Sequence, residues 1–137
     1  MERHSAEQSI DVGMDQMDGE HRVQMGLLSA FRDAVTDGRA EAEVNEIVEQ
    51  LIDFTKVHFM SEELLMRLYQ YPHYEAHVAE HDRMIEQIEQ ARERYRGGDE
   101  KTTTETLDAV LEGLASHVGQ SDRILGGYMG RLRETTG

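Results

Sequence analysis

Residues 44–65 read VNEIVEQLIDFTKVHFMSEELL, and this stretch decides the fold. Positions that would face a core recur at alternating steps of four and three residues, as in a helix packed into a bundle. They are Val44, Val48, Leu51, Thr55, His58, Glu62 and Leu65. The pattern predicts a helix over about residues 41–68, in which a histidine and a carboxylate occupy positions typical of leucine.

Three further stretches have the same periodicity, at about residues 17–36, 72–96 and 102–127. Short turns between such long helices make neighbouring helices antiparallel. We therefore predict an all-α fold, an up-down-up-down antiparallel four-helix bundle. One domain is expected over residues 1–137.

The turns and ends of the bundle are also predicted. Asp37-Gly38-Arg39 and Gly97-Gly98-Asp99 are turn sequences. Pro72 suits the first turn of the third helix, and Thr103 or Thr104 suits the cap of the fourth. Residues 1–16 are expected to form an N-terminal arm, and residues 128–137 a C-terminal tail that is either helical or a linker.

Composition excludes several classes of protein. The chain has no cysteine, so thiolate metal sites, iron–sulfur clusters and disulfides are ruled out, which fits a cytoplasmic protein. The net charge of −14 argues against nucleic acid or an anionic membrane as a partner. No apolar run approaches the roughly 18 residues of a membrane span, and the first residues do not resemble a secretory signal.

Polar side chains occupy core-facing positions on all four predicted helices. A buried imidazole or carboxylate must be paired, hydrogen-bonded, neutralised or bound to metal. One such histidine is unremarkable, but this set is too large for that interpretation. The residues are His21, His58, Glu62, His77, His81, His117 and Asp122.

Their distances from the turns place these residues at one level of the bundle. Side chains equally far from a connecting turn lie side by side in antiparallel helices, and the turn at 37–39 is midway between His21 and His58. The same test aligns Glu62 with the His77/His81 pair, and that pair with His117. His73 fails this test, because the position that faces it across the turn lies about six residues, or roughly 9 Å, from Glu62. We therefore expect His73 outside the cluster. His4, in the arm, is expected in solvent.

The ligand set indicates a binuclear metal site. Spacings of four put both members of His58/Glu62 and of His77/His81 on one helix face. His117 and Asp122 are five apart, so they either approach from opposite sides or need a π-bulge. This many nitrogen and oxygen ligands suits two iron ions better than one zinc, although zinc, manganese or cobalt would also be accepted. The neighbouring Glu63 and Glu80 are expected to face solvent, with support of the ligands as the alternative.

These residues resemble the hemerythrin family, its bacterial members most closely. The matching segments are Asp18-Gly-Glu-His21, His58-Phe-Met-Ser-Glu62, His77-Val-Ala-Glu-His81 and His117-Val-Gly-Gln-Ser-Asp122. The resemblance implies one iron on His77, His81 and His117 and a second on His21 and His58. It also implies that Glu62 and Asp122, with an oxo or hydroxo group, bridge two Fe ions. Dioxygen would then bind at the two-histidine iron.

The resemblance also predicts an oxygen pocket, lined by Gln24, Phe59, Gly113, Leu114 and Val118. The family commonly has leucine where this chain has Gln24, and tryptophan where it has Gly113. Two interpretations follow. Either the pocket is more open and polar, or Gln24 bonds a neighbouring polar group while another side chain fills the missing tryptophan's space.

We therefore expect a non-haem di-iron protein that binds dioxygen, for storage or for oxygen or redox sensing, and not an enzyme. A fused or separate signalling output domain is an expected partner. The alternative is a di-iron protein that reacts with peroxide or nitric oxide, or that handles iron. No histidine has glutamate three residues before it, which argues against ferritin-like carboxylate enzymes. Haem would need fewer ligands and more space.

Overall fold

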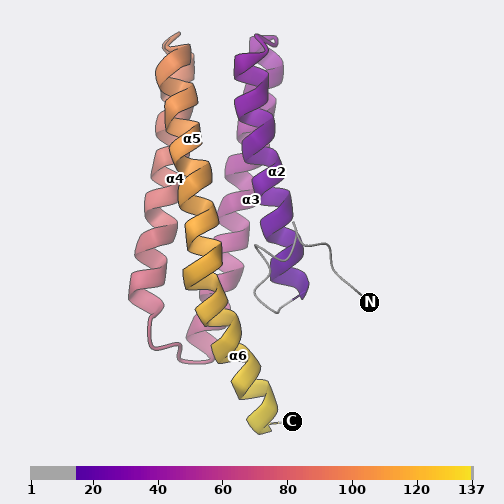
Figure 1. Cartoon of the computed structure of the whole chain (residues 1–137), viewed down its shortest axis with the longest axis vertical. Helices are drawn as coiled ribbons and strands as arrows, with labels where there is room; N and C mark the ends of the chain where they lie inside the picture. Colours follow the sequence, from indigo (N-terminus) through magenta and orange to yellow (C-terminus); the bar gives the residue numbers. More distant parts are fainter. Residues whose placement is uncertain (1–14, 137) are drawn as a thin grey trace.

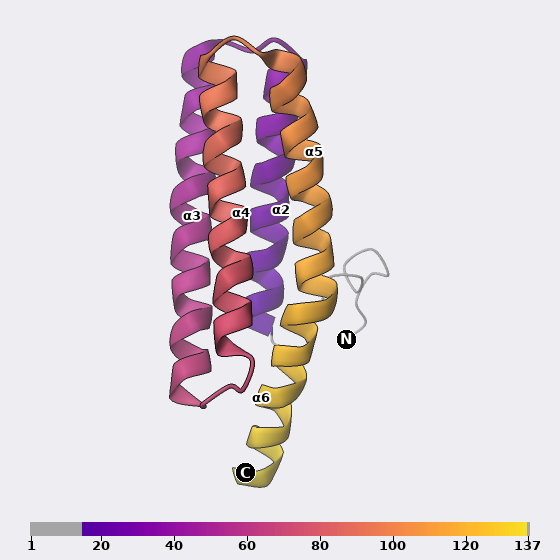
Figure 2. The same ribbon diagram turned by 90° about the vertical axis from the view of Figure 1, so that its left-hand side faces the viewer.

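The computed structural model describes residues 15–136 as an all-α, four-helix bundle. The long helices are α2 (Asp15–Thr36), α3 (Glu41–Leu68), α4 (Tyr74–Arg96) and α5 (Glu100–His117). Each packs against two antiparallel neighbours, in the ring order α2, α3, α4, α5 (Figures 1 and 2). The predicted fold class is confirmed.

The last part of the chain continues the line of α5. A π-helical turn, η1 (Val118–Asp122), joins α5 to α6 (Arg123–Thr136), which extends beyond the α3–α4 turn (Figure 2). The segment that was expected to be either a helical tail or a linker is therefore helical as far as Thr136. Most of the predicted N-terminal arm, including His4, lies outside the described residues.

Two glycines close the turns at one end of the bundle. Gly38 and Gly98 have φ of 67° and 81°, a left-handed conformation that glycine adopts without steric cost. This lets the next backbone N–H donate back into the helix, from Arg39 to Ala34 O at 3.0 Å and from Asp99 to Arg94 O at 3.1 Å. Both turns are therefore short, which holds the paired helices in register.

Two predicted helix starts are wrong by a few residues. Asp99 caps α5, because its side chain accepts a hydrogen bond from the Thr102 N–H, whereas the hydroxyls of Thr103 and Thr104 bond carbonyls one turn back. Pro72 lies before α4, and His73 is the residue that precedes the helix. The free N–H groups of a helix start favour an acidic cap, which explains Asp99.

The interior is divided along its length. An apolar core fills the half nearest the α2–α3 and α4–α5 turns, with Leu28, Phe31, Val48, Leu51, Ile88 and Leu107 among its buried members. The cluster of histidines and carboxylates lies nearer the other end, together with buried apolar side chains such as Met66, Tyr71 and Leu125. Among the residues that the structure describes, none of the helices has the length and apolar character of a membrane span.

Candidate metal centre

The bundle brings together all seven side chains that the sequence singled out. Each is at most 4 % exposed. Every long helix contributes, because each carries its ligands at the same distance from the turns. The helices supply His21 (α2), His58 and Glu62 (α3), His77 and His81 (α4) and His117 (α5), and the π turn supplies Asp122.

The seven residues fall into two overlapping groups. One nitrogen or oxygen from each of Glu62, His77, His81, His117 and Asp122 lies within 4.8 Å of the others, and the same holds for His21, His58 and Glu62. Glu62 belongs to both groups, so its two oxygens can serve two ions. The division gives two adjacent groups of candidate ligands that share a carboxylate.

Asp122 also reaches across both groups. Its Oδ2 lies 2.9 Å from His21 Nε2, while its Oδ1 lies 2.7 Å from His77 Nε2 and 3.0 Å from His117 Nε2. The π turn makes this possible, because its wider turn brings a residue five positions after His117 back to the same side of the helix. Of the two explanations that the sequence allowed for this spacing, the structure therefore has the π-bulge.

Three further carboxylates orient the histidines from outside. Glu20 lies 2.5 Å from His58 Nδ1, Glu63 lies 2.9 Å from His81 Nδ1, and Glu80 lies 2.6 Å from His117 Nδ1. Each carboxylate is next in sequence to a cluster residue but bonds a histidine on the neighbouring helix. A carboxylate on Nδ1 keeps the proton there and leaves Nε2 free to bind a metal.

These contacts correct one expectation and add a residue. Glu63 and Glu80 support ligands rather than simply facing solvent, and Glu80 is itself held by the Ser121 hydroxyl at 2.8 Å. Glu20 was not predicted. Its signal was available, because it precedes His21 and so lies at the level of His58, as Glu63 lies at the level of His81.

Charges within the cluster perturb its protonation. Burial opposes protonation of His77, but the carboxylates of Asp122 and Glu62 outweigh it and raise the His77 pKa from 6.5 to about 9. Burial likewise opposes ionisation of Asp122, yet the imidazoles of His117, His21 and His77 hold its pKa well below 3.8. In the metal-free protein, protons thus supply the positive charge that buried carboxylates need, and a metal ion must displace them.

The remaining buried nitrogen and oxygen atoms of the cluster are suited to binding a metal ion. Buried atoms that make no well-directed hydrogen bond, although several lie within ion-pair distance of one another, include Nε2 of His21, His58, His81 and His117, Oε2 of Glu62 and both oxygens of Asp122. Such atoms are costly in an apolar interior unless something binds them. Their convergence, with Nδ1 of three of the histidines already occupied, matches a set of metal ligands.

Comparison with known proteins agrees with this geometry. The model of the hemerythrin HHE cation binding domain matches residues 12–128. The chain belongs to the hemerythrin family. The family and its His/Glu/Asp cluster make it a non-haem iron-binding domain.

Bacteriohemerythrins are among the relatives of this hemerythrin-family chain. That of Methylococcus capsulatus is 26 % identical over 89 % of this chain and 91 % of its own length. That of Pseudomonas paraeruginosa is 27 % identical over 92 % and 79 %, and that of Stenotrophomonas maltophilia is 29 % identical over 83 % and 73 %. No solved structure gives a significant match.

Four of the five residues expected around an oxygen pocket of the hemerythrin type are buried. Leu114 and Val118 are apolar and fully enclosed, and Phe59 stacks on His81 with ring centroids 3.8 Å apart. The Gln24 amide donates to the Thr55 hydroxyl at 3.2 Å, while its carbonyl oxygen is buried without a partner. Gln24 therefore bonds a neighbouring polar group, as one of the two interpretations predicted.

Gly113 does not belong with the buried four. It is exposed and lines a surface hollow of about 150 Å³ between α4 and α5, with His117 at its inner side. A side chain at this position would meet nothing within 4 Å of its first carbon. The space left by the absent tryptophan is therefore unfilled, and it opens outward rather than into the interior.

Proposed function

We propose that this domain holds two iron ions and binds dioxygen between them and the apolar core. The observation that supports this proposal is that the seven buried candidate ligands divide into two overlapping groups, which share Glu62. His77, His81 and His117 would hold one ion and His21 and His58 the other, with Glu62 and Asp122 common to both. With three histidines in one group and two in the other, the second ion would have fewer protein ligands.

A di-iron centre supplies electrons to dioxygen and takes them back. This chain's residues do the rest. Glu20, Glu63 and Glu80 hold the imidazoles of three ligands in place through Nδ1. Phe59, Leu114 and Val118 are buried and apolar, so they would exclude water from the centre and limit the supply of protons there.

One observation favours a second candidate. Gln24 and Thr55 place an amide and a hydroxyl among the apolar side chains, one helical turn from His21 and His58. Polar hydrogens there can promote proton transfer to reduced oxygen. This supports a sensor of oxygen or redox state, or a protein that reacts with peroxide or nitric oxide, over a storage protein. A sensor would act in the cytoplasm with a signalling output domain, and it would bind its ligand without turning it over.

Anaerobic reduction followed by exposure to air tests the proposal. The iron-loaded protein should lose its near-ultraviolet absorbance on reduction and gain a new visible band when air is admitted. Removal of oxygen should reverse the band if the protein carries oxygen. Immediate return to the oxidised spectrum would favour the sensing or peroxide-reactive alternative, and no response to air would contradict both.

A further inference from the structure

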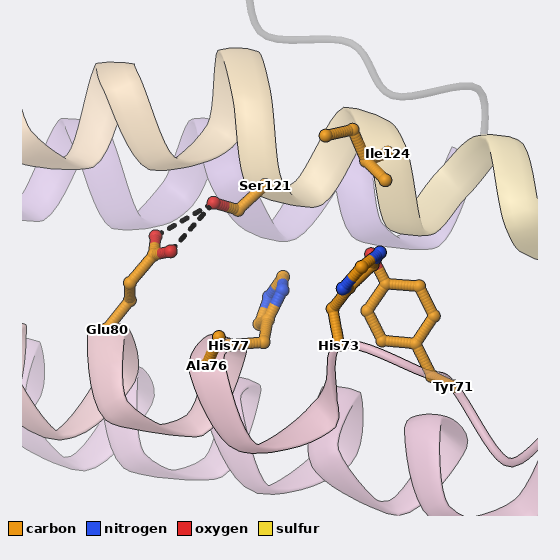
Figure 3. A pocket seen from close by; sticks show the side chains of 7 residues that line it. All are labelled: Tyr71, His73, Ala76, His77, Glu80, Ser121 and Ile124. Carbon is orange, nitrogen blue, oxygen red and sulfur yellow. Dashed lines mark hydrogen bonds between the residues drawn. The ribbon is translucent and has the colours of Figure 1, made fainter.

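A hollow in the bundle surface leads to the candidate metal centre. It has a volume of about 230 Å³ and lies between the start of α4 and the η1–α6 segment. Figure 3 shows the side chains of His73, His77 and Glu80, which come from the α4 side, and Ser121 and Ile124 on the facing helix. Tyr71 and Ala76 complete the lining.

Three histidines run from the mouth of this hollow to the cluster. His73 is exposed and immediately precedes α4, whereas His77 is 2 % exposed and His81 is fully buried within that helix, and successive members are four residues apart in sequence. The step from His77 to His81 is about 6 Å along the helix axis. His77 both lines the hollow and contacts Asp122 at 2.7 Å, so an ion at His73 is one helical turn from the centre.

A second hollow, the one beside Gly113, also reaches a cluster histidine. It touches His117 and shares Glu80 with the first hollow, but Arg83 lines it together with the apolar Met84 and Ala109. The positive charge of Arg83 opposes entry of a cation. The lining of the first hollow instead offers the imidazole of His73 and includes no lysine or arginine.

We propose that the hollow beside His77 is the route by which ferrous ion enters and leaves, with His73 as the first residue to bind it. This rests on the proposed function, since it needs a centre that holds iron. His73 alone offers one nitrogen, too few ligands to retain an ion, and so it passes the ion inward to His77. The arrangement gives the exposed histidine of the His73, His77 and His81 series a role that the centre itself does not require.

Two variants test this route, and a third serves as a matched control. His73→Ala removes the landing ligand, and Ala76→Phe fills the hollow from an exposed helix position. Ala109→Phe makes the same change at an exposed position in the hollow beside Gly113. Uptake of ferrous ion by the metal-free chain without oxygen, and its loss to a coloured ferrous chelator, give the two rates.

We expect His73→Ala and Ala76→Phe to slow both rates several-fold while final iron content and melting temperature stay at wild-type values. Ala109→Phe should leave the rates unchanged. Wild-type rates in both His73→Ala and Ala76→Phe would overturn the route, as would an equal slowing by Ala109→Phe. Failure of the wild-type chain to take up iron would instead contradict the proposed function, so the two failures are distinct.

Discussion

At the residue scale, Gln24 is the clearest departure from an apolar oxygen pocket. Its amide is 1 % exposed, bonds Thr55, and leaves its carbonyl oxygen unpaired. An unpaired polar atom in an interior position costs stability and tends to recruit a partner such as water. Gln24 therefore gives the interior beside His21 and His58 a source of polarity that leucine would not.

We predict that Gln24→Leu slows oxidation of the reduced, iron-loaded protein in air several-fold, because it removes this polarity. Decay of the visible band after mixing with dioxygen measures the rate. The same substitution at the exposed Gln50 should change nothing. If the wild-type band is already stable and Gln24→Leu decays no more slowly, the interior is dry and storage becomes the better description.

Loss of a shared carboxylate should be far more damaging. We predict that Glu62→Ala loses most of the metal, because it deprives both groups of an oxygen ligand. The substitution should also lower the free energy of unfolding by several kcal/mol, because His77 and His81 lose the buried carboxylate that faces them. Iron content and denaturant unfolding measure the two effects, and Asp122→Ala should behave alike. His73→Ala is the control, and loss of iron from it as severe as from His77→Ala would contradict the assignment of ligands.

All seven cluster residues were predictable from sequence, because helical periodicity fixes which positions face the core and turn positions fix their level. Which neighbour each imidazole bonds depends on ring rotation, which periodicity does not reveal. That is why Glu63 and Glu80 were assigned to solvent, and why the level of Glu20, which the sequence does give, did not by itself identify its bond to His58. The exposure of Gly113 was not predicted either, since a position one turn from His117 can still lie at the outer edge of the helix.

At the scale of single elements, the start of α5 is stabilised by one charged side chain, that of Asp99. The hydrogen bond from Thr102 lowers the Asp99 pKa below its usual 3.8. A depressed carboxyl pKa contributes stability fully above 3.8 and loses it as pH falls toward the folded-state pKa. We predict that Asp99→Ala lowers the melting temperature by a few degrees at pH 7.

The difference in melting temperature between Asp99→Ala and the wild type should shrink below pH 3.8, because the Asp99 carboxylate of the wild-type protein becomes protonated there. Thermal unfolding followed by circular dichroism at several pH values measures it. Asp99→Asn is the matched control, because it caps without titrating and so should keep its advantage over alanine in acid. If the melting temperature of Asp99→Ala fell further below that of the wild type as the pH decreased, the result would contradict a charged cap.

Helix existence and order were readable from the sequence, whereas helix ends were less so. Three threonines follow Asp99, and each can cap a helix, so composition alone did not select the acidic residue. The π turn was one of two open explanations of the His117–Asp122 spacing. The choice between them depends on tertiary packing, because the cluster forms only if Asp122 faces His21.

At the scale of the whole molecule, the bundle separates two tasks along its length. An apolar core near two of the turns supplies the stability that a polar interior cannot, because burial of apolar surface is the main favourable contribution to folding. The other half can then hold buried charges at a cost that metal binding offsets. Bound iron should accordingly stabilise the entire bundle, since its ligands come from all four long helices.

The number of iron ions per chain tests the central claim most directly. Elemental analysis should be made on protein expressed with ample iron and freed of loosely bound metal, with chain concentration from amino-acid analysis. Two overlapping ligand groups predict about two irons per chain, and Glu62→Ala should fall well below that. A reproducible value near one, or zinc in place of iron, would contradict a di-iron centre.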